Sequence, residues 1–145
     1  MLTKQGPDIT DTNIIDCPGG ERIIDGKTII DLACKAALSR KAEDITVFDV
    51  RGMTIITDYL MLASGTSDRH VKAIADAVLQ DIKETGVLPL RRDGTPEAGW
   101  IVLDYADAIV HIFHAREREY YDLERLYRGA QVIHPEAEEG LIRQS

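Results

Sequence analysis

The sequence predicts an α/β (α+β) fold, a mixed sheet of about five strands with flanking helices in the order αββαβββα. Two stretches, 28–38 and 67–82, repeat apolar residues at helical spacing, so each predicts a helix with one buried face. Residues 59–63 form a nearly continuous apolar run, which is typical of a central strand covered on both faces. Two strand-like segments, 100–105 and 108–113, are joined by two residues and therefore predict a hairpin.

The first half of the chain supplies one helix and two strands. Thr28 is a candidate N-cap for the first helix, because its hydroxyl can accept a hydrogen bond from the first turn. Residues 44–50 are rich in β-branched side chains with partial alternation, which predicts a strand. Arg51-Gly52 then breaks that strand before the apolar run begins.

The second half begins with the strongest helix signal in the sequence. Ser67 is a natural N-cap, and Gly86 stands where a helix end favours glycine. Residues 87–90 resume extended structure, and Pro89 favours an edge strand there. Residues 91–99 are rich in turn-forming residues and predict a loop.

A last helix is expected after the hairpin, over about residues 115–128. Tyr120, Leu123 and Tyr127 would then share one face of that helix. Gly129 ends the pattern.

The two ends of the chain differ from this middle. Residues 1–26 contain glycine and proline breaks and only short apolar pairs, so they predict a flexible N-terminal leader. Residues 27–129 are predicted to form the folded domain, and residues 130–145 an acidic C-terminal tail.

The charge balance constrains the class of partner. Seventeen Lys and Arg against 25 Asp and Glu give a net charge of −8 and a pI near 4.9. No stripe of Lys and Arg is present to neutralise phosphates, so primary nucleic-acid binding is not expected. An acidic surface suits a basic protein partner, although solubility alone is the simpler interpretation.

The sequence shows no signal for export or membrane insertion. No run approaches the ~18 apolar residues of a transmembrane helix, so no membrane association is expected. The first eight residues lack the apolar stretch of a signal peptide. Cys17 and Cys34 have no paired spacing, which favours a reducing cytoplasm.

One turn could seat a phosphate. Residues 64–67, Ser-Gly-Thr-Ser, lie between a buried strand and a helix N-terminus, where backbone N–H groups attract anions. A tight strand–helix turn and an N-cap require the same residues, so the structural interpretation is favoured. Nucleotidyl transfer would also need carboxylates paired on one strand, but Asp104 and Asp107 are separated by a turn and Asp49 stands alone. We therefore expect no catalytic residue, no metal site and no cofactor.

The histidines and the remaining cysteine also fail to form a site. His111 and His114 would lie on opposite faces of a strand or straddle its end, which is poor chelating geometry. His111 is flanked by apolar residues and is more typical of a hydrogen-bonded histidine in or beside the core. Cys34 lies in the apolar part of the first helix and is expected to be an inert core thiol.

Strand 100–105 offers a candidate interaction surface, because residues of one parity share a side of a sheet. The uniformly bulky set is assigned to the core: Ile101, Leu103 and Tyr105. The other set offers an aromatic anchor, a β-branched filler and a carboxylate: Trp100, Val102 and Asp104. One more aromatic side chain and two acidic rim contacts complete the candidate partner-binding set: Tyr121, Asp107 and Glu124.

Several motifs follow one another in a specific order between residues 28 and 128. They are Asp44-Ile45-x-Val47-x-Asp49-Val50, Thr57-Asp58-Tyr59, Ala63-Ser64-Gly65-Thr66-Ser67-x-Arg69-His70-Val71, Gly99-Trp100-Ile101-Val102-Leu103-Asp104-Tyr105, Val110-His111-x-Phe113 and Arg118-x-x-Tyr121-x-Leu123-Glu124-x-Leu126. In these motifs the chain resembles the ribosomal silencing factors, also called the Iojap family. Two positions depart from the family pattern, since Ala106 replaces the usual Gly and Tyr127 the usual Trp.

The resemblance implies a nucleotidyltransferase-like fold without catalytic acids, and therefore a non-enzyme. It implies binding to ribosomal protein L-fourteen on the large subunit, a steric block to subunit joining, and repression of translation when nutrients are scarce. Organellar members of the family also act in ribosome assembly, but the acidic leader has no Arg-rich transit peptide, which favours a bacterial cytoplasm. Similar factors form dimers when free, and exposed aromatic surface around Trp100 and Tyr121 would favour a homodimer here. The alternative is a divergent nucleotidyltransferase-like protein that binds a nucleotide through Ser64-Gly65 and the aspartates.

Overall fold

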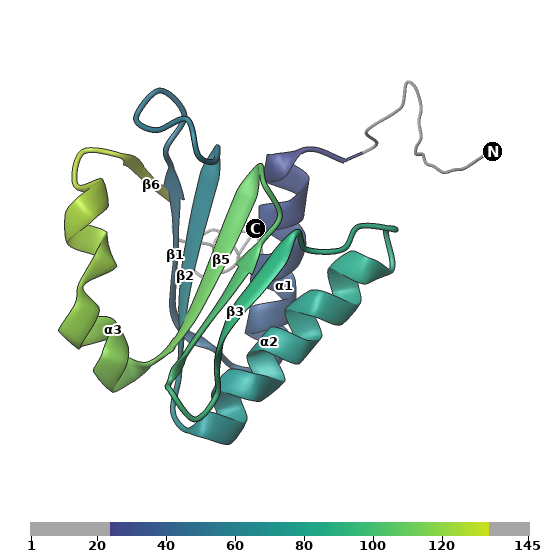
Figure 1. Cartoon of the computed structure of the whole chain (residues 1–145), viewed down its shortest axis with the longest axis vertical. Helices are drawn as coiled ribbons and strands as arrows, with labels where there is room; N and C mark the ends of the chain where they lie inside the picture. The colour runs from purple at the N-terminus through teal and green to yellow at the C-terminus, as the bar shows by residue number, and fades with distance from the viewer. Residues whose placement is uncertain (1–23, 134–145) are drawn as a thin grey trace, which may run out of the picture.

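A computed structural model describes residues 24–133, which form a six-stranded sheet with helices against both of its faces (Figure 1). In chain order the elements are α1 (Gly26–Ser39), β1 (Glu43–Asp49), β2 (Tyr59–Gly65), α2 (Asp68–Lys83), β3 (Arg91–Thr95), β4 (Trp100–Asp104), β5 (Ala108–His114), α3 (Ala115–Tyr121), the 3-10 helix η1 (Leu123–Tyr127) and β6 (Gln131–Ile133). The predicted mixed α/β fold is confirmed. Most of the predicted leader, residues 1–23, and residues 134–145 of the predicted tail lie outside the described residues.

The strands are ordered β3-β4-β5-β2-β1-β6 across the sheet. β2 and β5 run parallel, and the other neighbouring pairs are antiparallel. All seven residues of β2 are buried at the middle of the sheet, as the apolar run predicts. β4 and β5 form the predicted hairpin, with Trp100 opposite Phe113 and Leu103 opposite Val110.

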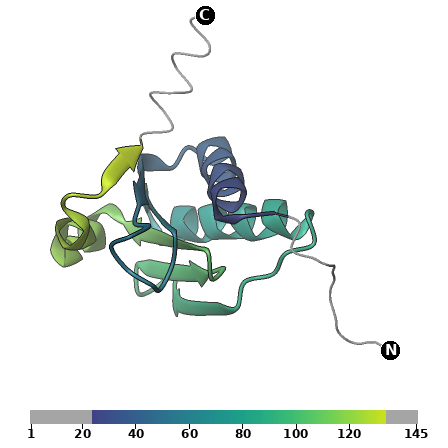
Figure 2. The same cartoon turned by 90° about the horizontal axis from the view of Figure 1, so that it is seen from above.

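The main core lies between the sheet and the layer of α1 and α2, which pack side by side on one face (Figures 1 and 2). The sheet contributes alternate side chains from each strand, with Val47, Met61, Val110 and Leu103 all at most 1% exposed. These positions share a face because side chains alternate along a strand. Burial of such side chains stabilises the fold by roughly 1.5–3 kcal/mol each.

A second, smaller core lies on the opposite face, beneath α3 and η1 (Figure 2). Its buried residues are Phe48, Val50, Leu60, Leu62 and Phe113. Leu123 and Tyr127 of η1 pack against them. The Tyr127 ring lies 5.9 Å from the Phe48 ring. The layer of α1 and α2 therefore covers a larger core than the layer of α3 and η1 does.

The helix starts follow the capping chemistry, with one correction. Ser67 caps α2 as predicted, because its Oγ accepts from the His70 N–H at 3.1 Å. The predicted cap Thr28 is wrong, since α1 begins two residues earlier and Asp25 Oδ1 accepts from the Thr28 N–H at 3.0 Å. A carboxylate at this position also suits the positive end of the helix dipole.

Two strand predictions need correction. Residues 87–90, predicted to be an edge strand, form no regular element, and β3 instead occupies part of the predicted loop 91–99. The edge strand pairs along its whole length with β4, from Arg91 opposite Asp104 to Thr95 opposite Trp100. β6, within the predicted tail, pairs with β1 and makes the sheet six-stranded rather than five-stranded.

The last helix is shorter than predicted. α3 ends at Tyr121 because Asp122 takes a left-handed backbone conformation with φ +49°, and the chain continues as η1. Leu123 and Tyr127 pack on the second core, whereas Tyr120 is 81% exposed. The predicted single face shared by these three residues is therefore wrong.

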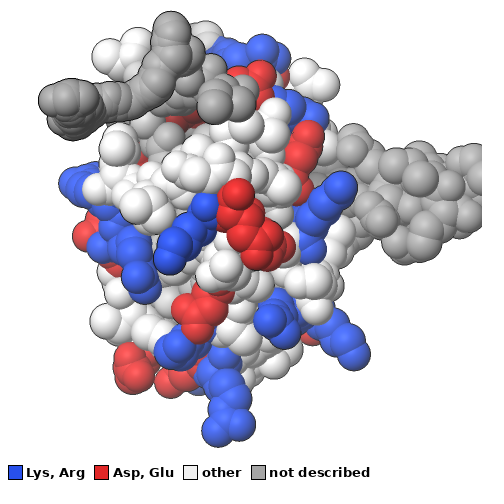
Figure 3. All heavy atoms as spheres, turned by 90° about the vertical axis from the view of Figure 1, so that its right-hand side faces the viewer, with Lys and Arg blue, Asp and Glu red and all other residues white. Residues whose placement is uncertain are grey.

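The side of the molecule that carries α2 shows both signs of charge interspersed (Figure 3). Lys72 and Asp76 form an exposed i,i+4 pair there, with Nζ 2.7 Å from Oδ2. Residues 24–133 hold 14 Lys and Arg against 18 Asp and Glu, so they carry −4 of the chain's −8. Within that range, no helix combines the length and apolarity needed to span a membrane.

Candidate protein-interaction surface

Trp100, the only tryptophan of the chain, lies on the sheet face opposite α1 and α2. We call this the open face, because the side chains that β4 places on it stay partly exposed although α3 and η1 pack on the same face. Trp100, Val102 and Asp104 are half-buried on it, while Ile101, Leu103 and Tyr105 are at most 7% exposed in the main core. The predicted parity of β4 is confirmed, and the partner-binding role of the open set stays a prediction.

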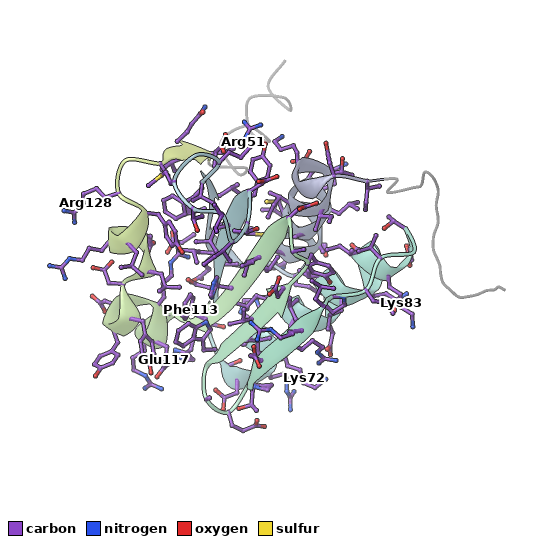
Figure 4. The ribbon with its side chains drawn as sticks, turned by 45° about the horizontal axis from the view of Figure 1, so that its top comes forward. Arg51, Lys72, Lys83, Phe113, Glu117 and Arg128 are labelled. Carbon is purple, nitrogen blue, oxygen red and sulfur yellow. The ribbon has the colours of Figure 1, made fainter. Side chains whose placement is uncertain are left out.

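An aromatic cluster surrounds the indole ring of Trp100. Ring centroids lie 4.9 Å away for Phe113, 4.6 Å for Tyr121 and 5.9 Å for His111. Figure 4 shows Phe113 on the side of β5 that faces α3. Aromatic pairs at such separations contribute about 0.5–1.5 kcal/mol beyond the area they bury. We call these four side chains the aromatic cluster.

His111 fixes the orientation of the indole. The Trp100 Nε1–H donates to His111 Nδ1 at 3.1 Å, so the predicted hydrogen-bonded histidine is confirmed. Burial lowers the pKa of His111 to about 4, which leaves the imidazole neutral at pH 7. Only the neutral ring offers Nδ1 as an acceptor for the indole.

α3 brings Tyr121 to this cluster through a close approach at its first turn. The His114 N–H donates to Gly99 O at 2.8 Å, and His114 Nδ1 accepts from the Arg116 N–H at 3.2 Å. Gly99 has φ +76°, and a Cβ there would fall 2.7 Å from Oε1 of Glu117. The left-handed backbone of the β3–β4 turn therefore favours glycine where the α3 segment leaves the sheet, and Glu117 fills the space that a Cβ would take.

The structure does not bring Asp104 and Asp107 to the aromatic cluster. Asp104 is four residues from Trp100 along β4, a separation of roughly 13 Å. Its Oδ1 accepts from the Ala106 N–H at 2.8 Å, so the carboxylate stabilises the β4–β5 turn. Asp107 lies in that turn, and its carbonyl accepts from the N–H groups of Asp58 and Tyr59, both at 3.2 Å.

Glu124 is held by an intramolecular ion pair. Its Oε2 accepts from Nε and Nη2 of Arg118 at 3.1 and 2.8 Å. Arg118 is only 8% exposed, although it lies in a run of alternating charges, Arg116 to Glu119, that is typical of an exposed helix face. Residue patterns alone therefore miss Arg118, and its place in the family motif is the one sequence signal that marks it.

The hydroxyls of the 64–67 turn serve the fold. Ser64 Oγ accepts from Nη1 of Arg118 at 2.9 Å, and Ser67 Oγ caps α2. The Thr66 N–H donates to His70 Nδ1 at 2.9 Å. These contacts support the structural interpretation of the turn over a phosphate seat. Within residues 24–133, no three His, Cys, Asp or Glu side chains are grouped so that they could hold a metal ion.

Partly exposed aromatic rings give this face the chemistry of a protein-interaction surface. Exposed apolar side chains continue from the cluster onto α3 and η1: Tyr120 at 81%, Tyr121 at 48% and Leu126 at 68%. The Tyr120 and Tyr121 rings meet edge to face at 5.0 Å. Half-exposed Trp and Tyr side chains are enriched among the residues that dominate protein–protein affinity.

Comparison with known proteins identifies the family of this chain. The model of the family described as "Ribosomal silencing factor during starvation" (RsfS) matches residues 24–144. The chain belongs to this family. The match includes every strand and helix that holds the aromatic cluster.

RsfS relatives extend this finding to curated sequences and solved structures. The ribosomal silencing factor RsfS of Bacillus subtilis is 38% identical over 106 residues, 73% of this chain and 90% of its own. The mouse protein named mitochondrial assembly of ribosomal large subunit protein 1 is 30% identical over 116 residues, 76% of this chain and 50% of its own. A crystal structure of a Chromobacterium violaceum protein has a TM-score of 0.70 at 33% identity, covering 74% of this chain and 89% of that one.

The structure shows the surroundings of the two residues that depart from the RsfS pattern, Ala106 and Tyr127. Ala106 adopts φ +72°, a left-handed conformation that the usual glycine takes without strain. Tyr127, in place of Trp, still packs its ring on Phe48. Tyr127 therefore supplies the aromatic contact to the second core with a smaller ring than Trp.

Proposed function

We propose that this chain binds the large ribosomal subunit through ribosomal protein L-fourteen. The bound protein sterically blocks joining of the two subunits and so represses translation under nutrient limitation. Membership of the RsfS family supports the ribosome as target, and the mouse relative's name refers to the large subunit. The observation that carries the binding surface is the half-exposed contact between Trp100 and Tyr121 on the open face.

The aromatic cluster supplies the centre of the proposed interface. A partner that covers Trp100 and Tyr121 removes aromatic surface from water, and both rings are already held in place by their neighbours. Pre-organised side chains lose little conformational entropy on binding. Val102 lies beside the cluster, opposite His111, and extends the contact along β4.

Charge supports a basic partner, but the residues divide into two roles. Asp104 and Asp107 lie at the far end of the hairpin, where Arg91 Nη2 is 3.8 Å from Asp104 Oδ2, and we assign both carboxylates rim contacts. Rim charges act mainly on the association rate and its salt dependence. Glu124 pairs with Arg118, so we assign it a supporting role within the protein as well as a rim contact.

Binding to purified L-fourteen tests the partner, and sucrose-gradient sedimentation of mixed subunits tests the block. We expect the chain to bind L-fourteen and to lower the yield of joined ribosomes. Lys72→Ala on α2, on the other side of the sheet (Figure 4), is the control and leaves both unchanged. A chain that binds the small subunit only, or that leaves subunit joining intact at saturation, overturns the proposal.

We further propose that the chain is a cytoplasmic non-enzyme and that its free form is a homodimer. In that dimer, the aromatic cluster of each copy is covered by the other, because exposed aromatic surface favours association. Light scattering with and without L-fourteen tests this, since the dimer is expected to dissociate when the partner binds. Saturable Mg²⁺-dependent binding of nucleoside triphosphates would instead favour the nucleotidyltransferase-like alternative.

A further inference from the structure

A buried arginine joins the α3–η1 segment to β1 and β2 of the sheet. We call residues Ala115 to Tyr127 the arm. Arg118, in the middle of α3, is 8% exposed and points into the fold instead of toward solvent. Its guanidinium reaches β1 and β2, whose contact residues are 54 to 74 positions away in the sequence.

The planar head of Arg118 is satisfied by four acceptors. Nη1 donates to the Asp44 carbonyl and to Ser64 Oγ, and Nη2 donates to Thr46 Oγ1 at 3.1 Å. Nε and Nη2 both donate to Oε2 of Glu124 in η1. A guanidinium presents its donors in a fixed fork, whereas a lysine ammonium is a single point that cannot reach all four groups at once.

The backbone of β1 is shaped to meet this guanidinium. Asp44 has φ +50°, and the β1–β2 register shifts between Glu43 and Thr46. A bulge of this kind turns a carbonyl out of the regular ladder. The freed Asp44 carbonyl accepts from Arg118, which satisfies a buried cation that would be costly to leave unpaired.

We infer that Arg118 is a positioning residue of the interface, an inference that rests on the proposed function of the open face. It lies too deep to contact a partner, but it sets the place of the arm on the sheet. Tyr121 is three residues further along α3, and its ring packs on Trp100 at 4.6 Å. A displaced arm separates Tyr121 from Trp100 and so breaks the aromatic cluster.

Two buried hydroxyls that accept from Arg118 allow a test of its role in which neither the arm nor the surface toward the partner is substituted. Thr46 is 8% exposed and Ser64 1% exposed, so neither can meet L-fourteen directly. We expect the double variant Thr46→Val, Ser64→Ala to weaken L-fourteen binding by about threefold to tenfold, as measured by calorimetry. Thr57→Val is the matched control, because Thr57 is equally buried (7%) and its hydroxyl donates to Tyr59 O at the other end of β2.

Arg118→Lys tests the donor geometry of the guanidinium, because lysine keeps the positive charge but not the planar arrangement of N–H groups. It is expected to weaken binding by about tenfold or more, while Arg116→Lys, on the exposed side of α3, binds as the wild type does. In the free protein, diluted until light scattering shows a monomer, emission from Trp100 shifts to longer wavelength in Arg118→Lys and in the double variant, and stays unchanged in Thr57→Val. This fluorescence measurement needs no partner and also applies to a variant with lowered stability.

The outcomes separate the two proposals. Wild-type affinity in both the double variant and Arg118→Lys overturns the positioning role, whatever their melting temperatures. Unchanged Trp100 emission in both variants overturns it as well. If wild-type protein fails to bind L-fourteen, the proposed function fails alone, and the emission measurement still decides whether Arg118 sets the position of the arm.

Discussion

The two faces of β4 and β5 use the same backbone for different tasks. The face toward α1 and α2 holds only apolar side chains at its centre, and Leu103, Val110 and Ile112 are all 0% exposed. The alternate side chains of the same strands lie on the open face. Among them are Trp100 and His111, which are half-buried, hydrogen-bonded to each other and in aromatic contact.

A small sheet can thus separate the residues that stabilise the fold from those that are open to a partner. Alternation along a strand places successive side chains on opposite faces, so one hairpin can complete a closed core and present an ordered surface. The surface residues are held by directed contacts, the indole–imidazole hydrogen bond and ring packing. The core residues are held by burial alone. Substitutions on the two faces should therefore affect different measurements.

The largest expected effect on stability comes from the face of β4 and β5 that packs on α1 and α2, which we call the closed face. Leu103→Ala removes a fully buried side chain and should lower the free energy of unfolding by about 2–5 kcal/mol. Val102→Ala, the next residue on the open face, should cost less than about 1 kcal/mol because Val102 is half-exposed. Urea unfolding of the two variants measures the contrast, and equal losses would contradict the division of the faces.

The open face should show the reverse behaviour when binding is measured. Trp100→Ala removes the centre of the aromatic cluster and should weaken L-fourteen binding by at least ~2 kcal/mol. Because Trp100 is half-buried and bonded to His111, we also expect a loss of roughly 1–2 kcal/mol in unfolding free energy. A variant with lowered stability but normal affinity would assign Trp100 to the core.

Local signals predict the elements that the chain builds from its own neighbours. β2 is an apolar run, and α2 combines Ser67 at its start with one apolar stripe, so both are predicted in type and position. β3 is missed because all five of its residues are exposed, and an edge strand with polar residues on both faces has no apolar alternation. β6 is missed because three residues are too short a pattern.

Contacts between residues far apart in the sequence limit how much of the candidate site the sequence can predict. The parity of Trp100, Val102 and Asp104 follows from alternation within one strand. The ion pair of Glu124 depends on Arg118, whose burial depends on acceptors in β1 and β2 far away in the sequence. No local pattern distinguishes this buried arginine from its exposed neighbours in α3, so the sequence alone does not predict that Glu124 pairs with it. The rim contact of Glu124 stays a prediction.

Acid should reduce the stability that the open face contributes before it affects the closed face, which has only apolar side chains at its centre. His111 has a folded-state pKa of about 4, below the ~6.5 of an unfolded histidine, so the unfolded state binds its proton first. This contribution to stability is complete above about pH 6.5 and is lost as the pH falls toward 4. His111→Gln keeps an acceptor for the Trp100 N–H but cannot be protonated.

Between pH 7 and pH 5, the wild type should therefore lose roughly 1–2 kcal/mol more stability than His111→Gln. Chemical unfolding at several pH values measures this difference, and the carboxylates common to both proteins cancel in it. Parallel stability curves for the two proteins would show that His111 is not the acid-sensitive group of the open face.

The smallest expected effect lies at the turn that joins β4 to β5, the strands that form both faces. Ala106 has φ +72°, and a left-handed conformation costs a non-glycine residue about 1–2 kcal/mol. Glycine removes that strain but raises the entropy of the unfolded chain, which offsets part of the gain. We expect Ala106→Gly to raise the unfolding free energy by about 0.5–1 kcal/mol and to leave L-fourteen binding unchanged. Thermal unfolding measures the gain. A destabilised variant would mean that the Ala106 methyl group makes contacts that outweigh its backbone strain.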